Sequence, residues 1–247
     1  MDNYTMTGTF TLPSKGLIYG KPVKEQVTLR SMTTADEMRR LSPSDAPNGV
    51  MARIIDDCMV DDIGISCYDM HIGDFQFLLH RLRVVTYGPE YKMSSKCRWC
   101  ASENINTINL DDLKVIEYTP DFDKLFDIDL PVTKKHIKLR MQTPRLIDGV
   151  SLKVKDSKNL SNTESAFFYT VQSLIDQVDG EKLDVVQMER FVKTLPMMDT
   201  NYIIQKGQKI NEAIGVDTNF IVGCDICGLE YRDSFRITSE FFGPTVD

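Results

Sequence analysis

The chain has 247 residues, of which 42% are hydrophobic and 26% are charged, with a formal net charge of −7 and a pI near 5.1. This composition is typical of a folded protein and unlike that of a disordered chain. No apolar run approaches the roughly 18 residues that cross a bilayer, and the N-terminal sequence MDNYTMTGTFTLPSKG contains no apolar signal segment. The sequence therefore predicts a chain used in a reducing cytoplasm, where cysteines serve as metal ligands, catalytic thiols or core residues.

The acidic balance also argues against nucleic-acid binding, because binding to phosphates needs clustered Lys and Arg. One basic stretch, TKKHIKLRMQTPR at 133–145, stands in an acidic surrounding. We interpret it as the solvated face of a strand or loop rather than as a nucleic-acid interface.

The first ninety residues predict a hairpin followed by helices. Phe10 and Leu12, then Val27 and Leu29, alternate around the turn-like PSKG and predict two short strands. Thr34 followed by Glu37 predicts a capping box that opens a short helix, which ends before the loop SPSDAPNG. Two further helices are predicted by apolar faces at helical spacing, namely Val50, Met51, Ile54, Ile55 and Cys58, then Ile72, Phe75, Leu78, Leu79, Leu82 and Val85. Gly88 and Pro89 end the last of them.

The middle of the chain first favours strands and then helices. Strands are predicted at INTINL (105–110), KVIEYTP (114–120), HIKLRM (136–141) and VSLKV (150–154). Two helices are predicted within 163–195, with the apolar faces Phe167, Phe168, Val171, Leu174, Ile175 and Val178, then Val185, Met188, Phe191, Val192 and Leu195. A third begins at Asp199 as its N-cap and runs to Ile214, with Gly215 as its stop. Near the C-terminus, TNFIVGC (218–224) and EYRDSFRIT (230–238) read as strands, so the predicted fold is α+β and helix-dominated.

Two CxxC pairs carry the clearest chemistry. SSKCRWC contains Cys97 and Cys100, and IVGCDICGLE contains Cys224 and Cys227. Four cysteines arranged as two CxxC turns are typical of a structural zinc site, because two intervening residues let both thiolates of a tight turn point at one ion. Gly228, directly after the second pair, can take a positive φ that turns backbone N–H groups toward the sulfurs. We therefore predict a zinc-ribbon-like clasp in which the four cysteines bind a structural Zn²⁺.

The separation of the two pairs leaves alternatives open. Residues 101–223 lie between them, whereas ribbons usually place roughly 15–20 residues there. A folded insertion is compatible with one site, since the entropy of loop closure grows only logarithmically with length. A redox dithiol is the second interpretation, although neither pair resembles the start of an amphipathic helix. Chance pairing is the third.

The clasp suggests a division of the chain. We predict an N-terminal hairpin with helices at 1–96, a zinc-ribbon-like module formed by 97–123 and 217–247, and an inserted strand and helix segment at 124–216.

The remaining polar residues are interpreted as structural. Cys58 and Cys67 are predicted core residues. The scattered His71, His80 and His136 are predicted to be surface or hydrogen-bonded helix residues, and Asp56, Asp57, Asp61 and Asp62 a solvated or partner-facing patch. Phe167 and Phe168 are candidates for partner contact, with a plain core role favoured. No nucleotide-binding or nucleophile motif is present in the sequence, so we expect no enzyme.

Several motifs together resemble a known family. They are TLPSKGLIYG, LHRLRVVTYGPEY, KCRWC, IEYTPDF and VGCDICGLE…FRITSEFFGP, in patches from about residue 10 to residue 244. Their order is similar to that of the baseplate hub assembly proteins, either hub subunit or hub assembly chaperone, of T-even-type contractile-tailed phages.

The resemblance implies a non-enzymatic assembly factor or minor structural subunit of the baseplate hub. It implies other hub proteins as partners, no membrane, and the host cytoplasm during assembly or the virion tail baseplate as location. Cys97, Cys100, Cys224 and Cys227 match the family as zinc ligands. A thiol–disulfide oxidoreductase and a zinc-ribbon nucleic-acid or polymerase adaptor remain the competing functions.

Overall fold

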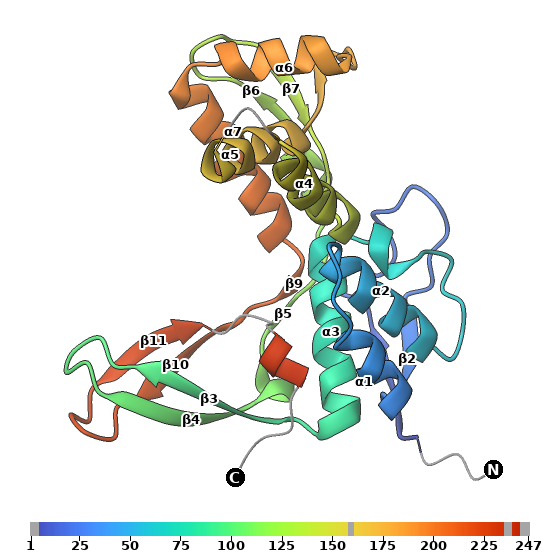
Figure 1. Cartoon of the computed structure of the whole chain (residues 1–247), viewed down its shortest axis with the longest axis vertical. Coiled ribbons are helices and arrows are strands. Elements are labelled where there is room, and N and C mark those ends of the chain that lie inside the picture. Colours follow the sequence, from blue (N-terminus) through green and yellow to red (C-terminus); the bar gives the residue numbers. More distant parts are fainter. Residues whose placement is uncertain (1–4, 158–160, 235–238, 243–247) are drawn as a thin grey trace.

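The computed structural model describes residues 5–157, 161–234 and 239–242. Within them the fold is α+β, with seven α-helices and small sheets of two or three strands. Figure 1 shows two lobes and an elongated arm: a helical lobe at the top, an N-terminal lobe on the right, and the arm at the lower left.

The N-terminal lobe begins as predicted, with a hairpin ahead of helices. Its elements are β1 (Thr7–Thr11), β2 (Gln26–Arg30), α1 (Thr34–Arg40), α2 (Pro47–Cys58), the 3-10 turn η1 (Cys67–Asp69) and α3 (Ile72–Tyr87). Strands β1 and β2 pair antiparallel, with Phe10 opposite Val27. The predicted faces of α2 and α3 supply the core, in which Ile54, Leu78 and Leu82 are fully buried.

The helical lobe has a separate core. It comprises η3 (Phe122–Leu125), β6 (Asp127–Asp129), β7 (His136–Leu139), α4 (Pro144–Asp156), α5 (Asn162–Leu174), β8 (Ile175–Val178), α6 (Val185–Thr194) and α7 (Met197–Glu212). The three strands form one antiparallel sheet in the order β6-β7-β8. In the basic stretch 133–145, Ile137 and Leu139 point into this core while Lys134, Lys135 and Lys138 are exposed, as the sequence predicts.

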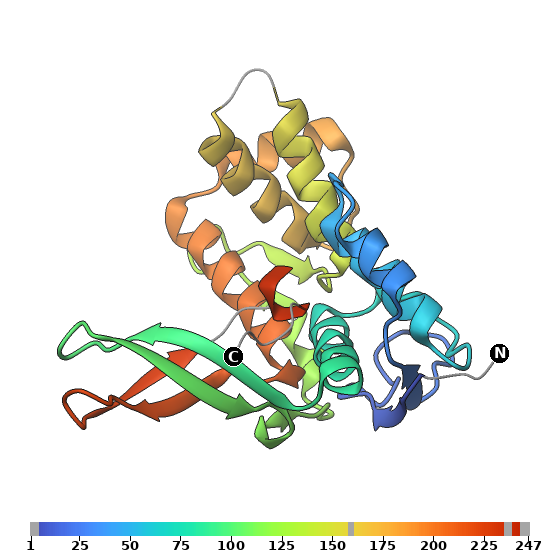
Figure 2. The same ribbon diagram turned by 60° about the horizontal axis from the view of Figure 1, so that its bottom comes forward.

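The arm is built from two antiparallel hairpins that are far apart in the sequence. One consists of β3 (Glu90–Lys96) and β4 (Glu103–Asn109), and the other of β10 (Asn219–Gly223) and β11 (Glu230–Ser234). Figure 2 shows them side by side, extending from the body of the molecule. Strands β5 (Val115–Ile116) and β9 (Gly215–Val216), which pair with each other, and η2 (Leu110–Asp112) connect the arm to the lobes.

A last short element returns to the N-terminal lobe. It is η4 (Ser239–Phe242), whose Phe241 and Phe242 are buried in the N-terminal core. The predicted strand 230–238 is confirmed at Glu230–Ser234, and residues 235–238 lie outside the described part of the chain. The division into 1–96, 97–123 with 217–247, and 124–216 stays a prediction.

Two predicted helix starts are displaced. The capping box of α1 uses Thr33 and Asp36 instead of Thr34 and Glu37, because the carboxylate of Asp36 accepts from the backbone N–H of Thr33 and also pairs with Arg30. Helix α7 begins at Met197, after Pro196, and not with Asp199 as its N-cap.

The carboxylate of Asp199 does not cap α7 as predicted but binds the turn between β6 and β7. It is fully buried and accepts hydrogen bonds from the backbone N–H groups of Val132 and Thr133 at 2.8 and 3.0 Å, so it holds the turn between β6 and β7. Burial favours its neutral form, but these donors outweigh that effect and hold the pKa of Asp199 below its ordinary value.

Two other assignments differ in type. The segment VSLKV (150–154) is part of α4 and not a strand, because Thr143 as N-cap and Pro144 at the first helical position start a helix that continues through it. Ile175 and Val178 belong to β8 rather than to the predicted helix face. Both side chains are nevertheless buried in the core of the helical lobe. Their apolar character fits a buried strand as well as a helix, so the spacing alone gave the wrong element.

Candidate metal centre

The first CxxC pair lies in the turn between β3 and β4. The backbone N–H of Cys97 donates to the carbonyl of Ser102 at 2.9 Å, and that of Ala101 donates to the carbonyl of Cys97 at 3.0 Å. The backbone N–H of Trp99 points at the sulfur of Cys97, 3.4 Å away. The turn therefore directs a backbone N–H group toward a thiolate position.

The second pair repeats this local structure between β10 and β11. The backbone N–H of Cys224 donates to the carbonyl of Leu229 at 3.1 Å, and that of Gly228 donates to the carbonyl of Cys224 at 2.9 Å. The backbone N–H of Cys227 lies 3.5 Å from the sulfur of Cys224. Gly228 has φ +69°, the positive value expected from the sequence. Two turns of different sequence thus present their cysteines in the same way.

The tips of the hairpins bring all four sulfurs together. The Sγ atoms of Cys97, Cys100, Cys224 and Cys227 lie within 4.8 Å of one another. The distance from Cys97 to Cys227 is 3.8 Å and that from Cys100 to Cys224 is 3.6 Å. Zn–S bonds of about 2.3 Å in a tetrahedron require sulfurs roughly 3.8 Å apart, so the donor set and its spacing fit one tetrahedral ion. All four are free cysteines.

The apolar cluster at the tip of the arm is small, so a bound ion would add stability that hydrophobic packing does not provide there. Among the described residues, the apolar cluster at the tip consists of Cys97, Cys224 and Tyr231, with Val222 and Cys227 partly buried against them. Such a cluster is too small to hold two hairpins together by hydrophobic burial. A metal bound between the turns would contribute that stability directly.

Hydrogen bonds already favour thiolates in part of the cluster. The hydroxyl of Ser102 lies 3.1 Å from the sulfur of Cys100 and 3.2 Å from that of Cys224. This hydroxyl has one proton and donates to one of the two sulfurs at a time: as a donor to Cys224, together with the N–H of Cys227, it lowers the pKa of that thiol to about 5, and as a donor to Cys100 it lowers the pKa of that one. For Cys227, the N–H of Leu229 favours the thiolate, but desolvation and the neighbouring sulfurs raise its pKa to about 12. Four thiolates at this spacing need a cation to coexist.

Three contacts that sequence analysis did not find hold the turns against each other. The indole Nε1 of Trp99 donates to the carbonyl of Glu230 at 3.1 Å. The backbone N–H of Asp225 donates to Oδ1 of Asn104 at 3.0 Å. The hydroxyls of Ser95 and Tyr231 are 2.6 Å apart. Because each contact joins residues more than a hundred positions apart, no local signal in the sequence could have revealed it.

The other cysteines lie elsewhere. Cys58 and Cys67 are fully buried in the N-terminal core, as predicted. Burial raises the pKa of the Cys58 thiol to about 12 and the pKa of the Cys67 thiol well above its ordinary value. Both therefore behave as small apolar core residues.

Two of the three histidines are buried and the third is exposed. His71 and His80 are buried in the N-terminal lobe, and burial lowers the pKa of each to about 4. His71 caps α3, as its ring accepts from the backbone N–H of Gly73. His136 is exposed between Asp127 and Asp129, and the hydrogen bond with Asp129 raises its pKa.

The acidic stretch and the phenylalanine pair are split by the structure. Asp57, Asp61 and Asp62 are exposed, whereas Asp56 is partly buried and accepts from the hydroxyl of Ser66 and the backbone N–H of Cys67. Phe168 packs against the helical core, but Phe167 is 45% exposed, so the core role favoured for both holds only for Phe168. Within the described part of the chain, the ligand atoms close enough together to hold a metal ion are the sulfurs of the four-cysteine cluster.

Comparison with known proteins identifies the family to which the chain belongs. A model of the family described as T4 bacteriophage base plate protein matches residues 4–243, nearly the whole chain. The chain belongs to this family. It is therefore a baseplate protein of the T4 type, and its partners are other phage baseplate proteins. No curated protein and no solved structure gave a significant match. None of the helices in the described parts is long and apolar enough to cross a membrane.

Proposed function

We propose that this chain is a non-enzymatic assembly factor or minor structural subunit of the baseplate hub, in which a structural Zn²⁺ bound by Cys97, Cys100, Cys224 and Cys227 makes the arm a zinc-ribbon-like clasp. The observation that carries this proposal is the convergence of four sulfurs from two hairpins that are distant in the sequence. The ion would fix the two ends of the intervening segment together and make the arm rigid.

The surface of the arm supports a role in binding other subunits. At its tip, Trp99 is 65% exposed, Ile226 74% and Leu229 51%. Apolar side chains gathered at the end of a projecting element are typical of a protein–protein contact. The proposed location is the host cytoplasm during assembly and the tail baseplate of the particle, where such a contact would be made.

Metal content is the measurement that tests the clasp. We expect one Zn per chain in protein purified without added metal or a histidine tag, and none in the double variant Cys224→Ser/Cys227→Ser. The variant should also unfold at a clearly lower temperature, because zinc binding contributes folding free energy. The matched control is Cys58→Ser, which removes a cysteine from the core and should keep its metal. The proposal would be contradicted by wild-type protein that contains no metal and unfolds at the same temperature as the double variant.

The assembly role needs its own readout. In infected cells that lack this chain, wild-type protein should restore complete baseplates seen by electron microscopy, and the double variant should not. The same preparations would be assayed for reduction of a model disulfide, for which we expect no turnover. Two sulfur–sulfur contacts of 3.6 and 3.8 Å both run between the two pairs rather than within one, which disfavours an independent redox dithiol.

A further inference from the structure

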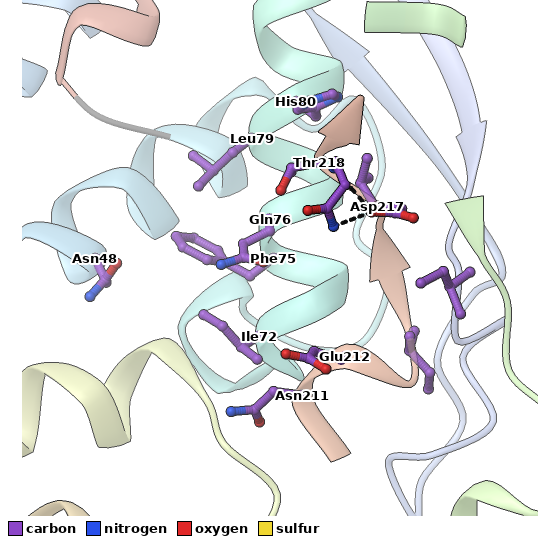
Figure 3. Close-up of a pocket in the computed structure, with 14 residues that line it drawn as sticks. Asn48, Ile72, Phe75, Gln76, Leu79, His80, Asn211, Glu212, Asp217 and Thr218 are labelled. Carbon is purple, nitrogen blue, oxygen red and sulfur yellow. Dashed lines mark hydrogen bonds between the residues drawn. The ribbon is translucent and has the colours of Figure 1, made fainter. Parts of the chain in front are cut away.

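A pocket lies where the two lobes and the arm meet. It has a volume of about 720 Å³, within the range of ligand sites. Figure 3 shows Phe75, Gln76 and Leu79 along one side of α3, Asp217 and Thr218 on the segment beside it, and Asn211 and Glu212 near the end of that segment. The pocket thus receives side chains from the N-terminal lobe, from the end of α7 in the helical lobe, and from the residues that lead into β10 of the arm.

The charge of the pocket has one sign. Glu212 and Asp217 contribute carboxylates, and none of the 14 lining residues shown is Lys or Arg. Asp217 is held by the side-chain amide and backbone N–H of Asn219, which lower its pKa, with Lys114 and Arg232 adding to this from outside the lining. Glu212 is exposed, and among the described residues no hydrogen bond or ion pair engages its side chain. The carboxylate of Glu212 is therefore available to pair with a cationic ligand, whereas the negative charge of the pocket would repel an anionic one.

The polar groups of the pocket call for a hydrogen-bond donor. The side chain of Asn211 carries an acceptor, Oδ1, that has no partner among the described residues; this atom is buried, so the side chain must rotate before an occupant of the pocket can donate to it. The two carboxylates are acceptors as well. On the α3 side, the largely buried Ile72, Phe75 and Leu79 contribute apolar surface. An occupant should therefore combine several donors and a positive charge with an aliphatic stem.

We propose that this pocket binds an arginine side chain, with its flanking residues, on an exposed segment of another baseplate protein. The guanidinium group has five donors, no acceptor and a permanent charge, and its methylene stem packs on apolar side chains. The occupant would touch both lobes and the root of the arm, so binding would fix the arm's direction relative to the body. The inference deepens the proposed function, since it takes the partner to be a protein of the same assembly.

The test is a titration of the isotope-labelled full chain with short blocked peptides, followed by NMR. The probe is acetyl-Leu-Arg-Leu-amide, and the matched control peptide carries the uncharged isostere citrulline. We expect the arginine peptide to shift the side-chain amide signals of Asn48, Gln76 and Asn211, which line the pocket. The citrulline peptide should bind about two- to fivefold more weakly, the change expected for loss of an exposed ion pair worth up to about 1 kcal/mol.

Variants locate the binding. Glu212→Gln should weaken binding of the arginine peptide about two- to fivefold, whereas Glu181→Gln, which removes the same charge from an exposed turn outside the pocket, should leave that binding unchanged. Gln76→Arg places a cation on the exposed edge of α3 inside the pocket and should abolish binding. Thermal unfolding of each variant would show that the fold is kept.

Three outcomes would overturn the inference: no shift of these amide signals, equal binding of the citrulline peptide, or equal binding of spermidine, which is a cation without a peptide. The titration uses the isolated chain and no assembly step. Its failure would therefore leave the metal content and the baseplate complementation unaffected, so the two proposals fail separately.

Discussion

At the scale of single residues, the two cysteine turns differ at one equivalent position. Gly228 follows the second pair with φ +69°, and Ala101 follows the first with φ +59°. A side chain in this left-handed region costs roughly 1 kcal/mol, and Ala101 bears that cost where glycine would not. The similar backbone conformation shows that the turn, and not the residue, sets the geometry. The sequence revealed the glycine but held no sign that alanine would adopt a similar φ.

An exchange of these two residues should therefore have opposite effects. Gly228→Ala should lower the free energy of unfolding by about 1 kcal/mol, because a Cβ there meets no atom within 4 Å and only the strained φ changes. Ala101→Gly should raise the free energy of unfolding by about 1 kcal/mol or less, since glycine also gains entropy in the unfolded chain. Urea unfolding at fixed zinc concentration measures both. Effects of the same sign in the two variants would contradict this account.

At the scale of elements, helix α2 takes its N-terminal cap from a distant helix. Its own N-cap residue, Ala46, provides no side-chain hydrogen bond. Instead the buried carboxylate of Asp148, on α4, accepts from the backbone N–H of Gly49 at 2.8 Å and from Nδ2 of Asn48 at 2.7 Å. The hydroxyl of Tyr68 donates to it as well, at 3.1 Å. One carboxylate thus joins the N-terminal lobe to the helical lobe.

Removal of this cap should be costly. Asp148→Ala leaves the buried backbone N–H of Gly49 unsatisfied and removes the partner of the Asn48 amide, so it should lower the free energy of unfolding by about 2–3 kcal/mol. The loss should be smaller for Asp148→Asn, which keeps one acceptor oxygen. The matched control is Asp45→Ala, which breaks the exposed ion pair of Asp45 with Lys155 and should cost less than about 0.5 kcal/mol. Urea unfolding of the three variants measures these losses. Equal losses for the buried and the exposed aspartate would show that the cap is unimportant.

At the scale of the whole molecule, the lobes also meet at His71. Its Nε2 lies 3.2 Å from the carbonyl of Ile210 on α7 and donates to it, while its Nδ1 accepts from the backbone N–H of Gly73 at 3.0 Å. A neutral ring is needed for both bonds, and burial lowers the pKa of His71 to about 4. Gly73 allows the backbone at Ile214, just after α7, to approach α3 closely, since a Cβ on residue 73 would lie 1.9 Å from the carbonyl oxygen of Ile214.

This junction makes stability depend on pH. The unfolded chain takes up a proton on His71 near pH 6.5, but the folded chain does so only near pH 4, so stability present above pH 6.5 is lost as pH falls toward 4. We expect His71 to contribute a loss of about 2 kcal/mol between pH 7 and pH 5. His71→Asn, which keeps an acceptor for Gly73 but does not titrate, should flatten the profile by that amount in urea unfolding. An unchanged slope would contradict the role of His71, since His80 remains in both proteins.

The sequence alone determined the features that depend on local chemistry. Alternating and helical spacing predicted the first hairpin, α2, α3 and α6, and the matched CxxC pairs singled out the four cysteines. The motifs also pointed to the baseplate family that the comparison established. These signals are local because spacing along a strand, helix or turn fixes which side chains share a face.

Only the tertiary structure decided which distant groups meet. Ser102 lies between the sulfurs of Cys100 and Cys224, Asp148 caps a helix about a hundred residues away, and Asp199 supports a turn instead of starting α7. The pocket at the junction of the lobes likewise draws on several separate segments. The sequence does not show which partner a polar side chain will have. A polar group needs a hydrogen-bond partner when it is buried, and which groups are buried depends on the packing of the complete chain.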